Sequence, residues 1–163
     1  IAMDLHPFKC RQLEETGKRM GLEQISVRSW DSTTAASDLL AQADKVICDV
    51  PCSGLGILRK KADIRFKKEE ELSDLPQIQG KILKAAASYC RPGGKLVYST
   101  CTILPEENQQ VVEAFLKQNK EFSLCPLVLP GDMGAEEGYR TFYPHKDGTD
   151  GFFIACLRRN QEP

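Results

Sequence analysis

The chain has 163 residues, of which 41% are hydrophobic, and this size fits one domain that can bury a sizeable core. Its formal net charge is −1, so the chain does not carry the strong positive charge that is typical of many nucleic-acid-binding proteins. It contains no apolar run of about 18 residues and no signal-peptide layout at its start. We therefore expect a cytoplasmic protein with no membrane partner.

Short β-rich runs alternate with helical segments along the chain, which predicts an α/β fold with a largely parallel sheet. The strands are expected at residues 1–3, 25–30, 45–50, 95–99 and 152–157. The helices are expected at residues 6–20, 32–43 and 69–89, and in a segment that opens at Pro105 with Glu106 and Glu107 in its first turn.

Proline and glycine punctuate this alternation in three places. Pro76 lies inside the predicted helix 69–89 and is expected to kink or split it. Residues 91–94, Arg-Pro-Gly-Gly, are typical of a helix end followed by a turn. Residues 127–151 are rich in Gly, Pro and charge and are expected to form a long loop, a kind of segment that is often functional.

Acidic and cysteine residues follow several of the predicted strands. Ligands of a doubly wound sheet bind beyond the carboxyl ends of its strands. The residues at these ends could therefore converge on one cleft, although Asp is also common in ordinary turns. They are Asp4, Asp31, Asp49 with Pro51 and Cys52, and Thr100 with Cys101.

A basic stretch lies between residues 59 and 68. It holds six cationic side chains against one acid, Asp63, and such local patches can contact phosphate even when the whole chain is nearly neutral. A solvated helix start explains the same composition, so both interpretations stay open. The cations are Arg59, Lys60, Lys61, Arg65, Lys67 and Lys68.

Seven cysteines are scattered along the chain with no Cys-x-x-Cys pair. An odd number in this arrangement favours neither a disulfide framework nor a zinc site, and no metal is expected. The core is the expected place for most of them: Cys10, Cys48, Cys90, Cys125 and Cys156.

Four segments together resemble the RNA cytosine-5 methyltransferases of the Sun/Nop2 family. They are residues 49–56 (DVPCSGLG), 98–102 (YSTCT), 106–108 (EEN) and 145–155 (HKDGTDGFFIA). The resemblance extends over nearly the whole chain and is greatest to the bacterial enzymes that methylate 16S ribosomal RNA. It implies a Rossmann-like S-adenosylmethionine-dependent methyltransferase fold, with a mostly parallel sheet and helices on both faces.

The implied reaction places a methyl group from S-adenosylmethionine on C5 of a cytosine in RNA. Cytosine C5 is a poor nucleophile, so a thiolate must first add at C6, and a carboxyl near the base can assist by hydrogen bonding at N3. By resemblance Cys101 is the nucleophile, Cys52 assists product release and Asp49 is the carboxyl. Spacing alone leaves the two cysteines open, because DNA cytosine-5 methyltransferases use a Pro-Cys nucleophile, which would point to Cys52.

The resemblance also implies contacts to the cofactor and to RNA. Asp4 matches the residue that binds the ribose hydroxyls, and Asp31 matches the residue on the adenine side. Asp49, with Pro51, lies at the methionine end. The RNA contacts are expected in the basic stretch, at Arg59, Lys60, Lys61 and Arg65.

The Gly-rich loop that follows the first strand of this fold has no counterpart before Asp4. We therefore expect residues 1–163 to be the C-terminal part of a single methyltransferase catalytic domain, with the first strand, its loop and an N-terminal RNA-binding domain not included. Two other hypotheses remain: a non-catalytic RNA-binding or assembly module, and a DNA cytosine-5 methyltransferase.

Overall fold

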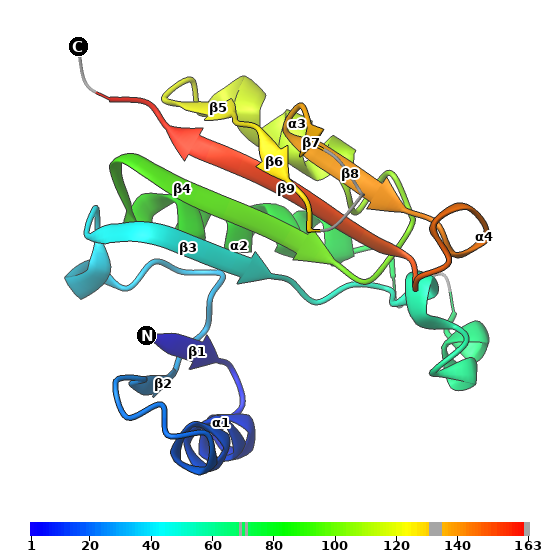
Figure 1. The fold of residues 1–163 in the computed structure, drawn as a ribbon, viewed down its shortest axis with the longest axis horizontal. Helices are drawn as coiled ribbons and strands as arrows, with labels where there is room; N and C mark the ends of the chain where they lie inside the picture. The colour runs from blue at the N-terminus through cyan, green and yellow to red at the C-terminus, as the bar shows by residue number, and fades with distance from the viewer. Residues whose placement is uncertain (69, 71, 131–134, 162–163) are drawn as a thin grey trace. The chain divides into compact units, whose positions relative to one another are not determined.

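The computed structural model describes residues 1–68, 70, 72–130 and 135–161 (Figure 1). The chain forms two compact units, Ile1–Thr34 and Ala35–Pro163. Each unit has its own secondary structure and is described separately.

The first unit is one β-α-β element. Strand β1 (Ala2–Asp4) pairs in parallel with β2 (Val27–Ser29), and helix α1 (Pro7–Arg19) connects them. A parallel pair needs such a crossover, because the chain must return to the same end of the sheet before the second strand begins. Proline stands in the first turn of α1, and Gly21 follows the helix with a φ of +69°.

The second unit is built on a mixed sheet, with the strand order β3-β4-β9-β5 and with β8 also paired to β9. Strands β3 and β4 are parallel, joined by helix α2, whereas β9 runs antiparallel to its neighbours. The α/β class is confirmed, but the sheet of this unit is mixed rather than mostly parallel, since the short connection from β8 to β9 carries no crossover helix. The strands are β3 (Ala43–Asp49), β4 (Cys90–Thr100), β5 (Phe122–Leu124), β8 (Tyr139–Phe142) and β9 (Phe152–Arg159).

The two faces of this sheet are covered differently. Helices α2 (Leu75–Tyr89) and α3 (Gln109–Gln118) pack on one face, over a core that includes Leu83, Tyr98 and Phe153 (Figure 1). Alternate residues of β9 point to the other face, where a smaller apolar cluster is formed with side chains from residues 125–142. Within this unit, α2 and α3 thus cover the same face of the sheet.

Two predicted helices differ from the observed ones. Residues 32–43 contain only a 3₁₀ turn, Ser37–Leu39, because Thr33 and Thr34 hydrogen-bond locally to Asp31 instead of starting a helix. Helix α2 begins at Leu75, so Pro76 stands in its first turn and does not kink it. Glu69 and Glu71, in the predicted N-terminal part of that helix, lie outside the described residues.

Two predicted turns and loops contain strands. Strand β4 begins at Cys90 and runs through residues 91–94, with Gly93 at a φ of +80°. The expected loop 127–151 contains β6 (Leu127–Val128), β7 (Ala135–Glu136), β8 and the short helix α4 (Pro144–Asp147), while residues 131–134 lie outside the described part. Strands of two to four residues are too short to show periodicity in a sequence.

Among the described residues, no helix has the length and apolar character needed to cross a membrane.

Candidate active site

The parallel pairing of β3 and β4 brings two cysteines together. Asp49, at the end of β3, lies opposite Ser99 near the end of β4, so the residues that follow each strand are neighbours. The sulfur atoms of Cys52 and Cys101 are 3.2 Å apart although the residues are 49 positions apart in the chain. Both side chains are partly exposed, so a substrate can reach them.

Asp49 is an exposed carboxylate at the same strand end. Its Oδ1 atom accepts a hydrogen bond of 3.1 Å from the hydroxyl of Ser99, which is buried. The pairing holds one carboxylate oxygen toward β4. Pro51 lies between Asp49 and Cys52, and its carbonyl accepts a hydrogen bond of 2.9 Å from Gln79.

The surroundings of Cys52 make its thiol less acidic. Burial, together with the hydrogen bond to Cys101, raises the pKa of the Cys52 thiol from 9.0 to about 12. Desolvation disfavours the charged thiolate, so Cys52 keeps its proton at neutral pH. It can therefore act as an S–H hydrogen-bond donor to a neighbouring sulfur.

A buried carboxylate holds the segment that carries Cys52. Glu107 is 2% exposed, and its Oε2 atom accepts hydrogen bonds from the amide N–H of Ser53 (2.9 Å) and from Nε2 of Gln79 (2.8 Å). Gln79 is fully buried on α2, and the same Nε2 atom donates to the Pro51 carbonyl. The Cys52 segment is thus held at the backbone positions on both sides of the cysteine.

Asn108, the residue after Glu107, holds the segment that carries Cys101. Its Oδ1 atom accepts a hydrogen bond of 2.6 Å from the hydroxyl of Thr100, and its Nδ2 atom donates to the carbonyl of Thr102 at 3.1 Å. The hydroxyls of Thr102 and Ser53 are 2.7 Å apart and connect the two segments.

Sequence reasoning placed Glu107 in the first turn of a helix and gave no role to Gln79, Asn108 or Ser53. Helix α3 instead begins at Gln109, and residues 107 and 108 turn inward. The signal for Glu107 and Asn108 was their place in a segment that resembles the family, whereas nothing local in the sequence marks Gln79.

Residues 145–155, the closing segment, reach the Cys101 backbone through Gly56. The Gly56 amide donates to the Cys101 carbonyl at 3.0 Å, and the Gly151 amide donates to the Gly56 carbonyl at 2.8 Å. A Cβ atom added at Gly56 would lie 2.1 Å from the Gly151 carbonyl oxygen, so only glycine fits this junction.

The basic stretch follows one short 3₁₀ turn, Leu55–Ile57, and contains a second, Ala62–Phe66, in place of the start of an α-helix. Arg59 and Lys60 both pair with the carboxylate of Asp150 in the closing segment, Arg59 at 3.4 Å.

The second of these turns ends at an exposed aromatic ring. Arg65 lies over the ring of Phe66, 5.8 Å from its centroid, and that ring is 79% exposed. Lys67, the next residue, donates to the carbonyl of Ser53 at 3.1 Å, which ties the turn to the Cys52 segment. Phe66 was missed because the stretch was judged by its charges.

Asp4 and Asp31 belong to the Ile1–Thr34 unit. Asp4 accepts a hydrogen bond of 2.8 Å from the His6 amide, lies 3.8 Å from the Lys9 ammonium and lines a pocket with α1 residues. Asp31 accepts hydrogen bonds from the hydroxyl and the amide of Thr33, which lower the pKa of its carboxyl.

Carboxylates at the ends of two parallel strands are chemically suited to the hydroxyl groups of a nucleoside, so the residues present fit S-adenosylmethionine. The structure brings Asp49, Pro51, Cys52 and Cys101 together, whereas the placement of Asp4 and Asp31 beside them stays a prediction.

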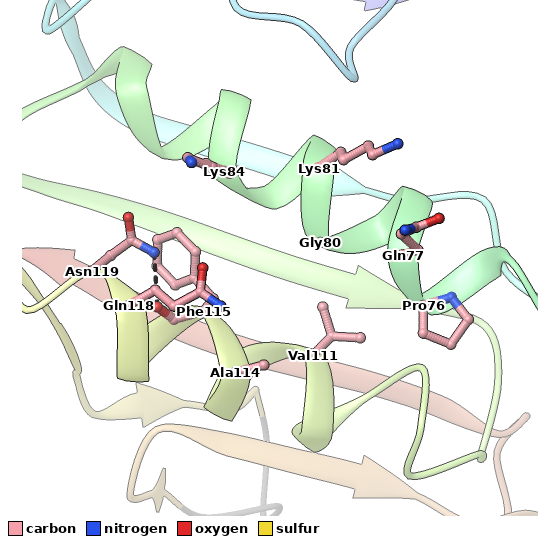
Figure 2. Close-up of a pocket in the computed structure, with 10 residues that line it drawn as sticks. All are labelled: Pro76, Gln77, Gly80, Lys81, Lys84, Val111, Ala114, Phe115, Gln118 and Asn119. Carbon is pink, nitrogen blue, oxygen red and sulfur yellow. Dashed lines mark hydrogen bonds between the residues drawn. The ribbon is translucent and has the colours of Figure 1, made fainter.

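A groove between α2 and α3 is separate from these residues. Figure 2 shows its lining, which includes Gly80 and Lys84 on α2 and Val111 and Phe115 on α3. None of the predicted site residues lines it.

Within the part of the chain that the structure describes, no group of three or more His, Cys, Asp or Glu side chains is placed to hold a metal ion.

Comparison with solved structures supports the fold. The chain is 35% identical to PH0851, with a TM-score of 0.87 over 96% of this chain and 36% of that one. It is 32% identical to NSun6 from Pyrococcus horikoshii, solved with SFG, an S-adenosylmethionine analogue, with a TM-score of 0.81 over 99% of this chain and 41% of that one. The Rossmann-like methyltransferase fold is therefore confirmed.

Comparison with curated proteins identifies the family. The chain is 35% identical to the probable ribosomal RNA small subunit methyltransferase B of Bacillus subtilis, over 97% of this chain and 37% of that protein. It is 34% identical to ribosomal RNA small subunit methyltransferase B of Pasteurella multocida, over 98% of this chain and 36% of that protein. The chain thus spans little more than a third of these relatives' length. The model of the family described as 16S rRNA methyltransferase RsmB/F matches residues 1–158, and the chain belongs to this family.

Proposed function

We propose that this protein transfers a methyl group from S-adenosylmethionine to C5 of a cytosine in 16S ribosomal RNA, through a covalent bond between Cys101 and C6 of the base. The observation that carries the proposal is the pair of partly exposed thiols 3.2 Å apart at the adjoining ends of two parallel strands, beside Asp49. The names of the curated relatives support ribosomal RNA as the substrate. That substrate implies a cytoplasmic location.

The chemistry requires one thiol for attack and is helped by a second. As the Cys101 sulfur bonds to C6, the electron pair of the C5–C6 double bond moves to C5, which becomes nucleophilic enough to take a methyl group. S-adenosylmethionine supplies that methyl from its sulfonium sulfur. A base then removes the C5 proton, the C5–C6 double bond forms again and the Cys101 sulfur leaves C6 with its electron pair.

The geometry of the two thiols allows this division of roles. The raised pKa keeps the Cys52 thiol protonated at neutral pH, so it remains an S–H donor. The same S–H group, 3.2 Å from the Cys101 sulfur, can donate a hydrogen bond to that sulfur as it leaves. Asp49 is proposed to share a proton with N3 of the base, so that the protonated N3–H donates to the carboxylate and C6 becomes more electrophilic.

The cofactor is proposed to be bound by the residues predicted at the strand ends. Asp4 would accept hydrogen bonds from the ribose hydroxyls, and Asp31 would lie on the adenine side. Asp49 and Pro51 would border the methionine end, where a carboxylate suits the positive charge of the cofactor.

The RNA is proposed to contact the turns at residues 55–66. Lys61 and Arg65 would neutralise phosphates, and Phe66 offers an exposed ring on which an unstacked base can lie. Arg59 and Lys60 share the Asp150 carboxylate, so their contribution to RNA binding is expected to be smaller.

Covalent trapping tests the proposal. The full-length Cys52→Ala variant, mixed with S-adenosylmethionine and 16S ribosomal RNA, should accumulate a protein–RNA adduct that survives denaturing gel electrophoresis. The double variant that also carries Cys101→Ala should form none. An adduct that persists without Cys101 would make Cys52 the nucleophile.

Two further measurements separate the alternatives. Absence of both S-adenosylmethionine binding by calorimetry and adduct formation would favour a non-catalytic RNA-binding module. Methyl transfer to DNA oligonucleotides at the rate seen with RNA would favour a DNA methyltransferase.

A further inference from the structure

The turn between β4 and α3 holds two adjacent polar side chains that reach different segments of the site. Glu107 and Asn108 are 2% and 0% exposed, although both are polar and neighbours in sequence. Buried polar groups are retained where they make hydrogen bonds that the surrounding structure needs. Their partners therefore indicate what each side chain does.

The Glu107 side chain reaches the Cys52 segment. One oxygen atom, Oε2, accepts from the Ser53 amide and from Gln79, and Gln79 also donates to the Pro51 carbonyl. The second oxygen, Oε1, and the Gln79 Oε1 atom have no hydrogen-bond partner among the residues that the structure describes. The two Oε1 atoms therefore accept no hydrogen bond from the described residues, while Oε2 of Glu107 accepts two.

The Asn108 side chain reaches the Cys101 segment. It accepts from Thr100 and donates to the Thr102 carbonyl, and these residues stand on either side of Cys101. An amide is needed here, because one end must accept and the other must donate.

We propose that Glu107 and Asn108 are positioning residues that place the two thiols separately: Glu107, with Gln79, places Cys52 for product release, and Asn108 places Cys101 for attack. The inference rests on the proposed function, since attack and release are steps of that reaction. A displacement of about 1 Å in a reacting group can slow a step on the order of 10²-fold. Loss of either side chain should therefore slow mainly one step.

The test compares variants of the full-length protein by single-turnover kinetics with S-adenosylmethionine and 16S ribosomal RNA. Glu107→Leu removes the acceptor and should slow release on the order of 10²-fold while attack changes little, so that the adduct accumulates. Asn108→Ala should slow attack by a similar factor and accumulate no adduct. Glu106→Leu is the matched control, because Glu106 is the exposed neighbour in the same turn.

A conservative change separates hydrogen bonding from general damage. Glu107→Gln keeps an oxygen that can accept from both Ser53 and Gln79, so release should be restored to near the control rate. If Glu107→Leu does not fold, Gln79→Leu provides the same test, because it removes the other donor to Glu107 and the bond to Pro51. Release as slow in Glu107→Gln as in Glu107→Leu would overturn the proposal.

A readout without RNA or cofactor completes the design. Hydrogen exchange should become faster in the peptide that contains Ser53 in Glu107→Leu, and faster in the peptide that contains Thr102 in Asn108→Ala. Equal slowing of attack and release in both variants, with equal exchange in both peptides, would show a merely structural role and overturn the proposal. Absence of an adduct in Cys52→Ala would instead refute the proposed reaction itself.

Discussion

The second unit contains two pairs of neighbouring thiols, one partly exposed and one buried. Cys52 and Cys101 lie 3.2 Å apart on segments that follow β3 and β4, partly exposed and held by polar side chains. Cys125 and Cys156 lie 2.8 Å apart, buried in an apolar cluster beside β9. Close sulfur atoms therefore do not identify a reactive site. Access and a strand-end position distinguish the first pair.

The largest expected difference between the pairs is in methyl transfer. Cys101→Ser should reduce transfer to RNA on the order of 10⁴-fold or more, because the residual activity of an enzyme without its nucleophile is small. Cys125→Ser should stay within about tenfold of the natural protein, since its cost falls on stability. Radioactive methyl incorporation measures both. Equal losses would remove the functional distinction between the pairs.

The next difference is in thiol labelling. Iodoacetamide under native conditions should modify Cys101 and Cys52 on the order of 10² times faster than Cys125 and Cys156, because the buried pair reacts only after local opening. Mass spectrometry of the labelled peptides gives the rates, and urea-unfolded protein, where all sites are open, is the control.

Alkaline pH should destabilise the folded chain through the thiols that burial keeps neutral. Burial raises the pKa of Cys90 from 9.0 to about 11 and that of Cys156 to about 12. Below pH 9 these thiols are neutral in both the folded and the unfolded chain, so their contribution to stability is complete. Above pH 9 the unfolded chain ionises first, and stability falls as the pH rises toward 11 to 12.

Melting temperatures between pH 8 and 11 measure this fall. Cys156→Ala and Cys52→Ala should each flatten it, because burial raises the pKa of both thiols to about 12. A slope that neither variant changes would contradict the assignment of the alkaline loss to these thiols.

The smallest difference is expected in stability at neutral pH. Cys156→Ala removes a packed side chain from the cluster and should lower the free energy of unfolding by about 1–2 kcal/mol. Cys52→Ala should lower it less, since part of that side chain already faces solvent. Urea denaturation measures both values. A larger loss for Cys52→Ala would mean that its thiol has a structural role.

The ends of the strands could be predicted from the sequence more accurately than the segments that connect the strands. The residues of β3, β4 and β9 were recognisable from β-rich runs, and the positions of Asp49, Cys52 and Cys101 followed from where those runs end. The helix expected at residues 32–43 failed because Thr33 and Thr34 bond to Asp31. Strand β8 was missed because it pairs with β9, and β6 and β7 were missed because they pair only with each other. Such pairings have no local signal.

By itself the sequence determined the family, the α/β class and the identity of the two thiols, because these depend on residue types that stand next to one another in the chain. Only the tertiary structure decided that the thiols are in contact, that Cys52 has a raised pKa, and that Glu107 and Asn108 hold separate segments. The physical reason is that burial and hydrogen bonding depend on residues far apart in sequence: Gln79 lies 28 positions from both Pro51 and Glu107, and nothing but the packing of α2 beside β3 and β4 brings them together.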